Sequence, residues 1–127
     1  MTLETTVSDR TEFARQLGFT SAWFELGIVD DAVLLKLKSR WDAGQDPHTE
    51  HYRYAAFREF LEAHRPLTPE LASALFELGA ADPEPGMGTA MMADIVYQPE
   101  CPANVLQAAL ASGREYVVRA VEKREKE

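Results

Sequence analysis

Helix start and stop signals recur along the whole chain, and each pair encloses one short helix. In the clearest case Thr68 and Pro69 begin a helix that Gly79 ends. Threonine caps free N–H groups, proline loses nothing at the first helical position, and glycine readily adopts the conformation that follows a helix. Between these signals the apolar residues recur three to four positions apart, at Leu71, Ala74, Leu75 and Leu78. This spacing predicts an amphipathic helix that buries one face.

The same signals predict helices in the rest of the chain, with the following limits: Ser8 to Gly18, Ser21 to Gly27, Asp30 to Gly44, Asp46–Pro47 to Pro66, residues 89–97, Cys101–Pro102 to Gly113, and a last helix after Gly113. Residues 35–38 alternate as a strand does, but the helical period of the surrounding window favours a helix. Residues 89–97 are apolar nearly all round, which is typical of a buried helix, so we expect this helix at the centre. The sequence therefore predicts an all-α fold of about eight helices.

Polar and apolar residues divide the remaining predicted helices into inward and outward faces. Arg53 is expected on the solvent side of its helix. Val105, Leu106, Ala109 and Leu110 are expected to point inward, as are Val117, Val118 and Val121. The charged tail, residues 123–127, is expected to fray. Trp23, Phe24 and Trp41 are expected in the core, although part of residues 19–24 could instead anchor a partner.

Length and composition fit one globular domain over residues 1–127. The 46% of hydrophobic and 27% of charged residues are close to globular averages. No apolar run approaches the roughly 20 residues of a membrane span, and the N-terminus lacks the features of a secretion signal. The single cysteine, Cys101, cannot form an internal disulfide. These features predict a cytoplasmic protein that does not enter a membrane.

Two of the predicted helices begin alike, at Thr68-Pro69-Glu70-Leu71 and at Cys101-Pro102, with apolar pairs at Ala74-Leu75, Val105-Leu106 and Ala109-Leu110. Their prolines are 33 positions apart (102 − 69), a spacing typical of stacked helix pairs. From about Leu67 to Arg124 the chain resembles HEAT/armadillo-like and variant leucine-rich α-helical repeats. The resemblance implies antiparallel helix pairs stacked as a short α-solenoid, which we favour, and the residues themselves leave an irregular helical bundle open as the alternative.

The net charge of −8 is unevenly distributed. Between Pro66 and Gly113 the chain has no lysine or arginine, but it has six acidic residues: Glu70, Glu77, Asp82, Glu84, Asp94 and Glu100. Such a segment would repel a nucleic acid. We therefore predict a non-enzymatic protein–protein interaction domain, inhibitor- or immunity-like, that meets a basic partner through Glu77, Asp82, Glu84, Asp94 and Glu100. The alternative for these residues is that they only keep a small domain soluble.

His48 and His51 form the one metal-like pattern, because residues three apart on a helix can face the same way. A small metal- or ligand-binding protein that uses His48 and His51, with Tyr52 or His64 nearby, is the alternative function. The other interpretation of the pair is a polar first helical turn. The sequence on balance predicts no resident metal and no cofactor.

No catalytic constellation is recognisable. Cys101 lies at a helix start, but no histidine follows it as a base, so a structural role is predicted. The glycines of Gly86-Met87-Gly88 could cradle an anion or let a buried helix approach its neighbour, and we favour close approach. The carboxylates form no paired arrangement in an apolar setting. The sequence predicts no enzyme.

Overall fold

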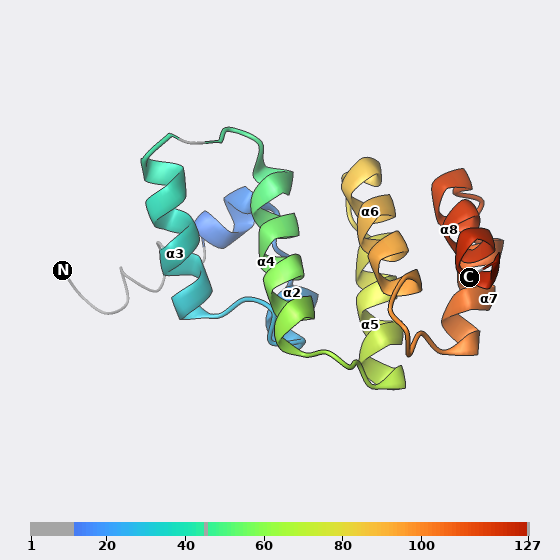
Figure 1. The fold of residues 1–127 in the computed structure, drawn as a ribbon. Coiled ribbons are helices and arrows are strands. Elements are labelled where there is room, and N and C mark those ends of the chain that lie inside the picture. Colours follow the sequence, from blue (N-terminus) through green and yellow to red (C-terminus); the bar gives the residue numbers. More distant parts are fainter. Residues whose placement is uncertain (1–11, 45, 127) are drawn as a thin grey trace. The chain divides into compact units, whose positions relative to one another are not determined.

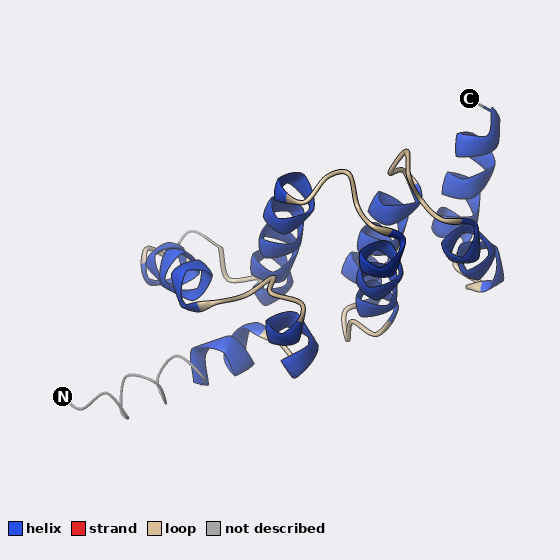
Figure 2. Ribbon diagram, turned by 90° about the horizontal axis from the view of Figure 1, so that it is seen from below, coloured by secondary structure: helices blue, strands red, loops and turns tan. Residues whose placement is uncertain are grey.

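The computed structural model describes residues 12–44 and 46–126, and these residues form helices and the segments that connect them (Figure 1 and Figure 2). A first helix is described over residues 12–17. The others are α2 (Ser21–Glu25), α3 (Asp31–Asp42), α4 (Thr49–Ala63), α5 (Pro69–Ala80), α6 (Pro85–Val96), α7 (Ala103–Ala111) and α8 (Glu115–Lys126). No described residue lies in a strand, so the predicted all-α fold of about eight helices is confirmed. Within the described ranges no helix is long and apolar enough to cross a membrane.

The chain divides into two compact units, Met1–Phe60 and Leu61–Glu127, with the division inside α4. Each unit has buried residues of its own, and each is described by itself below. The single domain over residues 1–127 stays a prediction.

Two of the predicted helix caps are present in the structure. Asp30 precedes α3, and its side chain accepts a hydrogen bond of 2.9 Å from the backbone N–H of Val33. Thr68 precedes α5 and accepts one of 3.2 Å from the N–H of Leu71. Residues 35–38 lie within α3, as the helical period of the longer window predicts. The predicted cap at Ser8 lies outside the described residues.

Several predicted helix starts are shifted, and α6 shows the largest shift because it begins at Pro85 rather than at residue 89. Ser21 is the first residue of α2 rather than its cap, and Thr20, which precedes it, makes no side-chain capping bond. Asp46 does not cap α4, which begins at Thr49. Its Oδ1 atom instead accepts a hydrogen bond of 2.9 Å from the N–H of His48. Asp46 therefore stabilises the turn before the helix, because a short carboxylate can bond to the backbone two residues on.

Gly79 was predicted to end its helix, and this prediction is wrong. α5 continues through Gly79 to Ala80, and Gly79 is buried. A Cβ atom on Gly79 would lie 2.9 Å from Cβ of Met91 and 3.0 Å from the backbone oxygen of Gly88, both on α6. Gly79 is therefore needed for close packing of α5 on α6. The glycines that do follow helices have positive φ angles, at Gly18, Gly27, Gly44 and Gly113.

Aromatic contacts join the helices of the first unit. The Trp41 ring meets Phe13 and Tyr52 edge to face, with ring centroids 6.4 and 5.6 Å apart. Trp23 is only 2% exposed and packs against Phe19. These contacts connect the helix over residues 12–17 with α3 and α4. The prediction of Trp23 as a core residue is confirmed, that of Phe24 is wrong because 42% of it is exposed, and Trp41 is only partly buried.

Arg53 was expected in solvent, but only 4% of it is exposed. Its Nη1 atom donates a hydrogen bond of 2.7 Å to the carbonyl oxygen of Leu17, where the first helix ends. The C-terminal end of a helix carries the negative end of the helix dipole, which stabilises a cation at this position. A Cβ atom on Gly18 would lie 2.4 Å from the same nitrogen, so glycine leaves room for the guanidinium. The period of α4 could not reveal this contact, because its acceptor lies 36 positions away.

α6 is the central helix of the second unit, as predicted. It contacts α5, α7 and α8, and Figure 1 shows α5 beside α6 and α7 beside α8. Met91, Ile95 and Val96 have no exposed surface. Val105, Ala109, Val117 and Val121 are buried as expected. Leu110 is not, since 48% of it is exposed at the end of α7.

The charged C-terminal segment does not fray at Arg124. Helix α8 runs to Lys126, and the Arg124 guanidinium donates to the carbonyl oxygens of Val96, Gln98 and Pro99 at 3.2, 2.7 and 2.9 Å. These three oxygens lie at and just beyond the C-terminal end of α6, where carbonyl groups lack helical partners. Arg124 therefore fastens α8 to the end of the central helix.

Replacing Arg124 with alanine is expected to lower the free energy of unfolding by about 2 kcal/mol, because hydrogen bonds from a charged donor contribute about 1.5 to 3 kcal/mol. Urea unfolding followed by circular dichroism measures the change. Lys123→Ala removes a neighbouring exposed cation and should change stability by less than about 0.5 kcal/mol. Equal effects of the two substitutions would show that the carbonyl contacts of Arg124 add no stability.

Candidate functional site

The five residues predicted as a partner surface lie in two places. Glu77, Asp82 and Glu84 occupy the end of the α5–α6 pair where α5 stops and α6 starts. Asp94 lies near the other end of α6, and Glu100 follows in the connection to α7. Glu84 and Asp94 are ten positions apart (94 − 84), which is about 15 Å along the helix axis. The structure therefore does not gather the five into one cluster.

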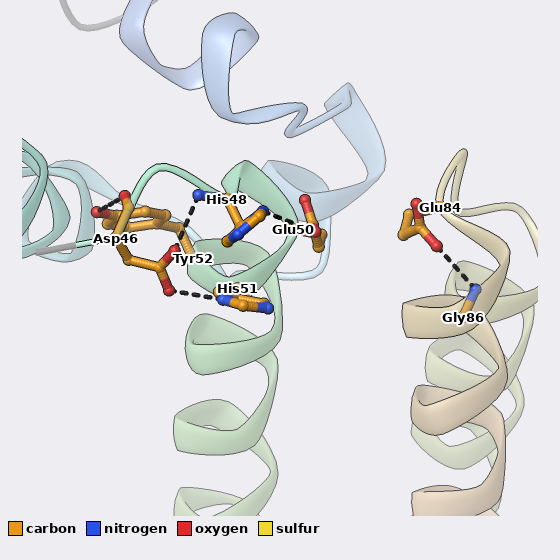
Figure 3. A network of polar contacts seen from close by, with 7 residues as sticks. All are labelled: Asp46, His48, Glu50, His51, Tyr52, Glu84 and Gly86. Carbon is orange, nitrogen blue, oxygen red and sulfur yellow. Dashed lines mark hydrogen bonds and ion pairs between the residues drawn. The ribbon is translucent and has the colours of Figure 1, made fainter.

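Asp82 and Glu84 form hydrogen bonds within the connection itself. Asp82 is buried, and its Oδ1 atom accepts a bond of 2.9 Å from the N–H of Glu84. The Glu84 carboxylate then accepts a bond of 3.1 Å from the N–H of Gly86, which caps α6 (Figure 3). The N–H of Gly88 is also satisfied, by the carbonyl of Glu84. The N–H groups of both glycines are therefore already used, which argues against an anion cradle, and the space around Gly88 fits close approach of the helix.

Four acidic side chains of the segment without lysine or arginine are exposed: Glu70, Glu77, Glu84 and Glu100. None of them forms an ion pair with a residue that the structure describes. Two arginines that follow this segment in the sequence, Arg114 and Arg124, donate hydrogen bonds to it. Arg114 donates to the Ala80 carbonyl at 3.2 Å and to Thr89 Oγ1 at 3.0 Å, and Arg124 donates to three carbonyls. Both guanidinium groups thus bind neutral oxygens, and the four carboxylates keep their charge uncompensated.

Glu70 and Glu77 lie on the same face of α5, because residues seven apart are two helical turns apart. Ser73 lies between them and accepts a hydrogen bond of 2.9 Å from the side-chain amide of Asn104 on α7. The pair of glutamates thus borders the contact between α5 and α7. Glu70 was not among the residues predicted for the partner surface, although its seven-residue spacing from Glu77 is visible in the sequence.

A second polar cluster lies in the first unit, where the chain enters α4 (Figure 3). Asp46 Oδ2 lies 2.6 Å from His51 Nδ1, and the Tyr52 hydroxyl donates to the Asp46 carbonyl at 2.7 Å. The His48 and His51 ring centroids are 5.0 Å apart. His48 Nδ1 also lies 3.8 Å from a carboxylate oxygen of Glu50. The structure therefore brings the two predicted histidines together and adds Asp46, which the sequence pattern did not identify.

His64 and Tyr52 were the other groups expected near these histidines. His64 follows the far end of α4, whose 15 residues span roughly 22 Å. The Tyr52 hydroxyl already donates its hydrogen bond to the Asp46 carbonyl oxygen. Within the described ranges no group of three or more histidine, cysteine, aspartate or glutamate side chains is placed to hold a metal ion. Neither His64 nor Tyr52 can therefore complete a site at His48 and His51.

The hydrogen bonds to Asp46 favour its ionised form. The backbone N–H of His48 is the main cause that lowers the pKa of the Asp46 carboxyl, followed by the hydrogen bond from His51. Asp46 also lines an open pocket of about 300 Å³ with Trp41, Gly44 and Pro47. The carboxylate is turned toward His51 rather than left free in this pocket. Its chemical role is therefore to orient the imidazole ring.

This lowered pKa gives a pH-dependent contribution to stability. The contribution is fully present above the ordinary aspartate pKa of about 4, and it is lost as the pH falls from there through the lowered value in the folded protein. Wild type should therefore be more stable than Asp46→Asn near pH 6, and the difference should shrink as the pH approaches 3. Urea unfolding across this range measures it.

His48→Ala is the matched control for that prediction. It keeps the backbone N–H that is the main cause of the shift, so most of the pH dependence should remain. A constant difference between wild type and Asp46→Asn from pH 6 to pH 3 would contradict the role given to Asp46.

Cys101 is buried, which favours the structural role predicted from the sequence. It is 8% exposed, and burial raises the pKa of its thiol more than the nearby Arg124 lowers it. A thiol with a raised pKa forms little of the nucleophilic thiolate at neutral pH.

Residues 19–24 were also considered as an aromatic anchor for a partner. Only Phe24, which is 42% exposed, remains available for that role, because Phe19 and Trp23 are buried.

Comparison with protein-family models, with curated proteins and with solved structures found no match. Function is therefore inferred from the side chains and their placement.

Proposed function

We propose that this chain is a non-enzymatic interaction domain that binds a basic protein partner through exposed carboxylates at both ends of the α5–α6 pair, together called the acidic surface of its second unit. The observation that carries the proposal is the set of four exposed carboxylates without an ion pair among the described residues: Glu70, Glu77, Glu84 and Glu100. Nearby arginines bind carbonyl oxygens instead. Uncompensated charge of one sign steers an oppositely charged partner and speeds association.

The partner is a protein rather than a nucleic acid, because a polyanion would be repelled by the same carboxylates. Inhibition of a basic protein, as an immunity protein neutralises a toxin, is one concrete form of this function. Stacked helix pairs of the HEAT/armadillo-like kind would suit it, since they present extended surfaces to partners. We place this activity in the cytoplasm.

The test compares two variants with equal charge changes. One replaces Glu70, Glu77, Glu84 and Glu100 with glutamine, and the control replaces the exposed Glu12, Glu25, Glu59 and Glu122. Each untagged protein is coupled to a support and used to capture proteins from a lysate of the source cells at low and moderate salt. Any protein captured by wild type is then purified and titrated against all three.

A basic partner that binds wild type and the control equally, and the first variant at least tenfold more weakly with a flatter salt dependence, supports the proposal. The proposal is wrong if no basic protein is retained at low salt. It is also wrong if the control loses as much affinity as the first variant, because general net charge would then explain the binding.

A further inference from the structure

Among the features that the acidic surface leaves unexplained, the histidine pair at the start of α4 has the most specific geometry. Its two rings are held near each other by groups on either side, and both are more than half exposed, with side-chain exposures of 62% for His48 and 56% for His51. Figure 3 shows the His48 ring above the His51 ring, with Asp46 to one side and Glu50 to the other.

Each ring has one nitrogen engaged and one available. Nδ1 of His51 faces Asp46, and because that carboxylate can only accept, Nδ1 carries a proton, which in the neutral ring leaves the lone pair on Nε2. Nδ1 of His48 faces Glu50 more loosely. No interaction involves either Nε2 atom within the described residues. A neutral imidazole with a free Nε2 lone pair is a metal ligand.

The spacing of the rings also fits one shared ion. A divalent transition metal lies about 2.0 to 2.1 Å from an imidazole nitrogen, and so about 3.2 Å from the ring centroid. Two imidazoles at a tetrahedral angle around that ion would have centroids about 5.2 Å apart. The observed separation is 5.0 Å. The ring separation therefore allows both imidazoles to reach one ion once rotation of the His48 side chain turns its Nε2 atom toward that of His51.

The local electrostatics favour a cation on balance. The start of α4 is the positive end of a helix dipole, which disfavours a cation by a fraction of a unit charge. Asp46 and Glu50 add two carboxylates next to the rings. A carboxylate that accepts from the far nitrogen of a ligating histidine orients the ring and strengthens it as a donor. Asp46 stands in this relation to His51.

We propose that His48 and His51 bind one divalent ion of the copper, nickel or zinc type through Nε2, with Asp46 as the positioning residue and water as the remaining ligands. Nitrogen ligands select these ions over magnesium and calcium, which require oxygen ligands. With two protein ligands the ion is exchangeable rather than a permanent part of the fold. The site lies in the first unit and is independent of the acidic surface proposed above.

Isothermal titration of the full, untagged chain with nickel chloride and copper chloride near neutral pH tests the proposal. One ion per chain is expected. His48→Ala and His51→Ala should each abolish saturable binding, and Asp46→Asn should weaken it by about tenfold or more while leaving one site per chain. The three positions are at least partly exposed, so circular dichroism should show each variant folded.

His64→Ala is the matched control, because it removes the third histidine at the other end of α4 and should leave the affinity unchanged. Electron paramagnetic resonance of the copper complex should show hyperfine structure from two nitrogen donors. The proposal is overturned if wild type does not bind in a saturable way, or if His48→Ala and His51→Ala bind as well as wild type. Equal loss in His64→Ala would place the ion elsewhere and overturn it too.

Discussion

Met92→Asp is expected to abolish folding of the second unit. Met92 lies in the middle of α6 with 2% of its surface exposed, and it packs beside Gly79 of α5. An ionised carboxylate placed there without a partner costs several kcal/mol, or takes up a proton and still loses the packing of the methionine side chain. Small domains have only about 5 to 15 kcal/mol of stability in total, so one such change is enough.

Hydrogen exchange followed by mass spectrometry measures this loss helix by helix. Protection should disappear from α5 through α8, and urea unfolding should show no cooperative transition for these helices. Two controls separate charge from location. Met92→Leu conserves volume and should cost less than about 1.5 kcal/mol. Leu110→Asp introduces the same charge at a position that is 48% exposed and should leave the unit folded. A Met92→Asp variant with unchanged exchange and melting would show that α6 is not the central helix.

Gly88→Ala is expected to cost about 3 kcal/mol, although alanine favours helices. A Cβ atom on Gly88 would lie 2.3 Å from the carbonyl oxygen of Gly79, well inside any tolerable contact. That oxygen belongs to the backbone of α5, so it cannot move aside as a flexible side chain would. The two helices would have to separate, and the buried contacts between them would weaken. The expected loss is therefore that of an overpacked core, larger than the roughly 1 kcal/mol by which alanine favours a helix.

Gly86→Ala is the matched control, because it makes the same substitution two residues earlier on the same helix. A Cβ atom there would meet only the Glu84 carboxylate oxygen at 3.2 Å, the end of a flexible and exposed side chain. Its stability should stay within about 1 kcal/mol of wild type or rise slightly. Thermal unfolding of the two variants side by side measures the difference. Equal stability would contradict the close approach of α5 and α6 at Gly88.

Local signals were reliable where the responsible atoms are close in sequence. Asp30 and Thr68 cap their helices because the N–H groups they satisfy lie three residues ahead. Gly113 and the other positive-φ glycines follow helices because only the adjacent backbone decides that conformation. The burial of α6 was predictable because a helix without a polar face has few other stable locations.

The candidate sites were predictable only in part. The pairing of His48 with His51 follows from helical spacing, but Asp46 was interpreted as a cap and its bond to His51 was missed. The acidic residues were visible as a composition bias. Their division between two ends of the α5–α6 pair depends on how the helices fold back, which no local pattern specifies.

Sequence alone determined the all-α class, most helix limits and the central position of α6, because capping, backbone conformation and amphipathic period act within one or two helical turns. Only the tertiary structure decided the roles of Gly79, Arg53 and Arg124. In the sequence Gly79 looks like a helix stop, but in the structure it allows α5 to pack closely on α6. The two arginines look like solvated charges, but they bind carbonyl oxygens that are distant in sequence. Their contacts join residues 9 to 36 positions apart, and whether a small residue or a long cation finds such a partner depends on the packing of whole helices.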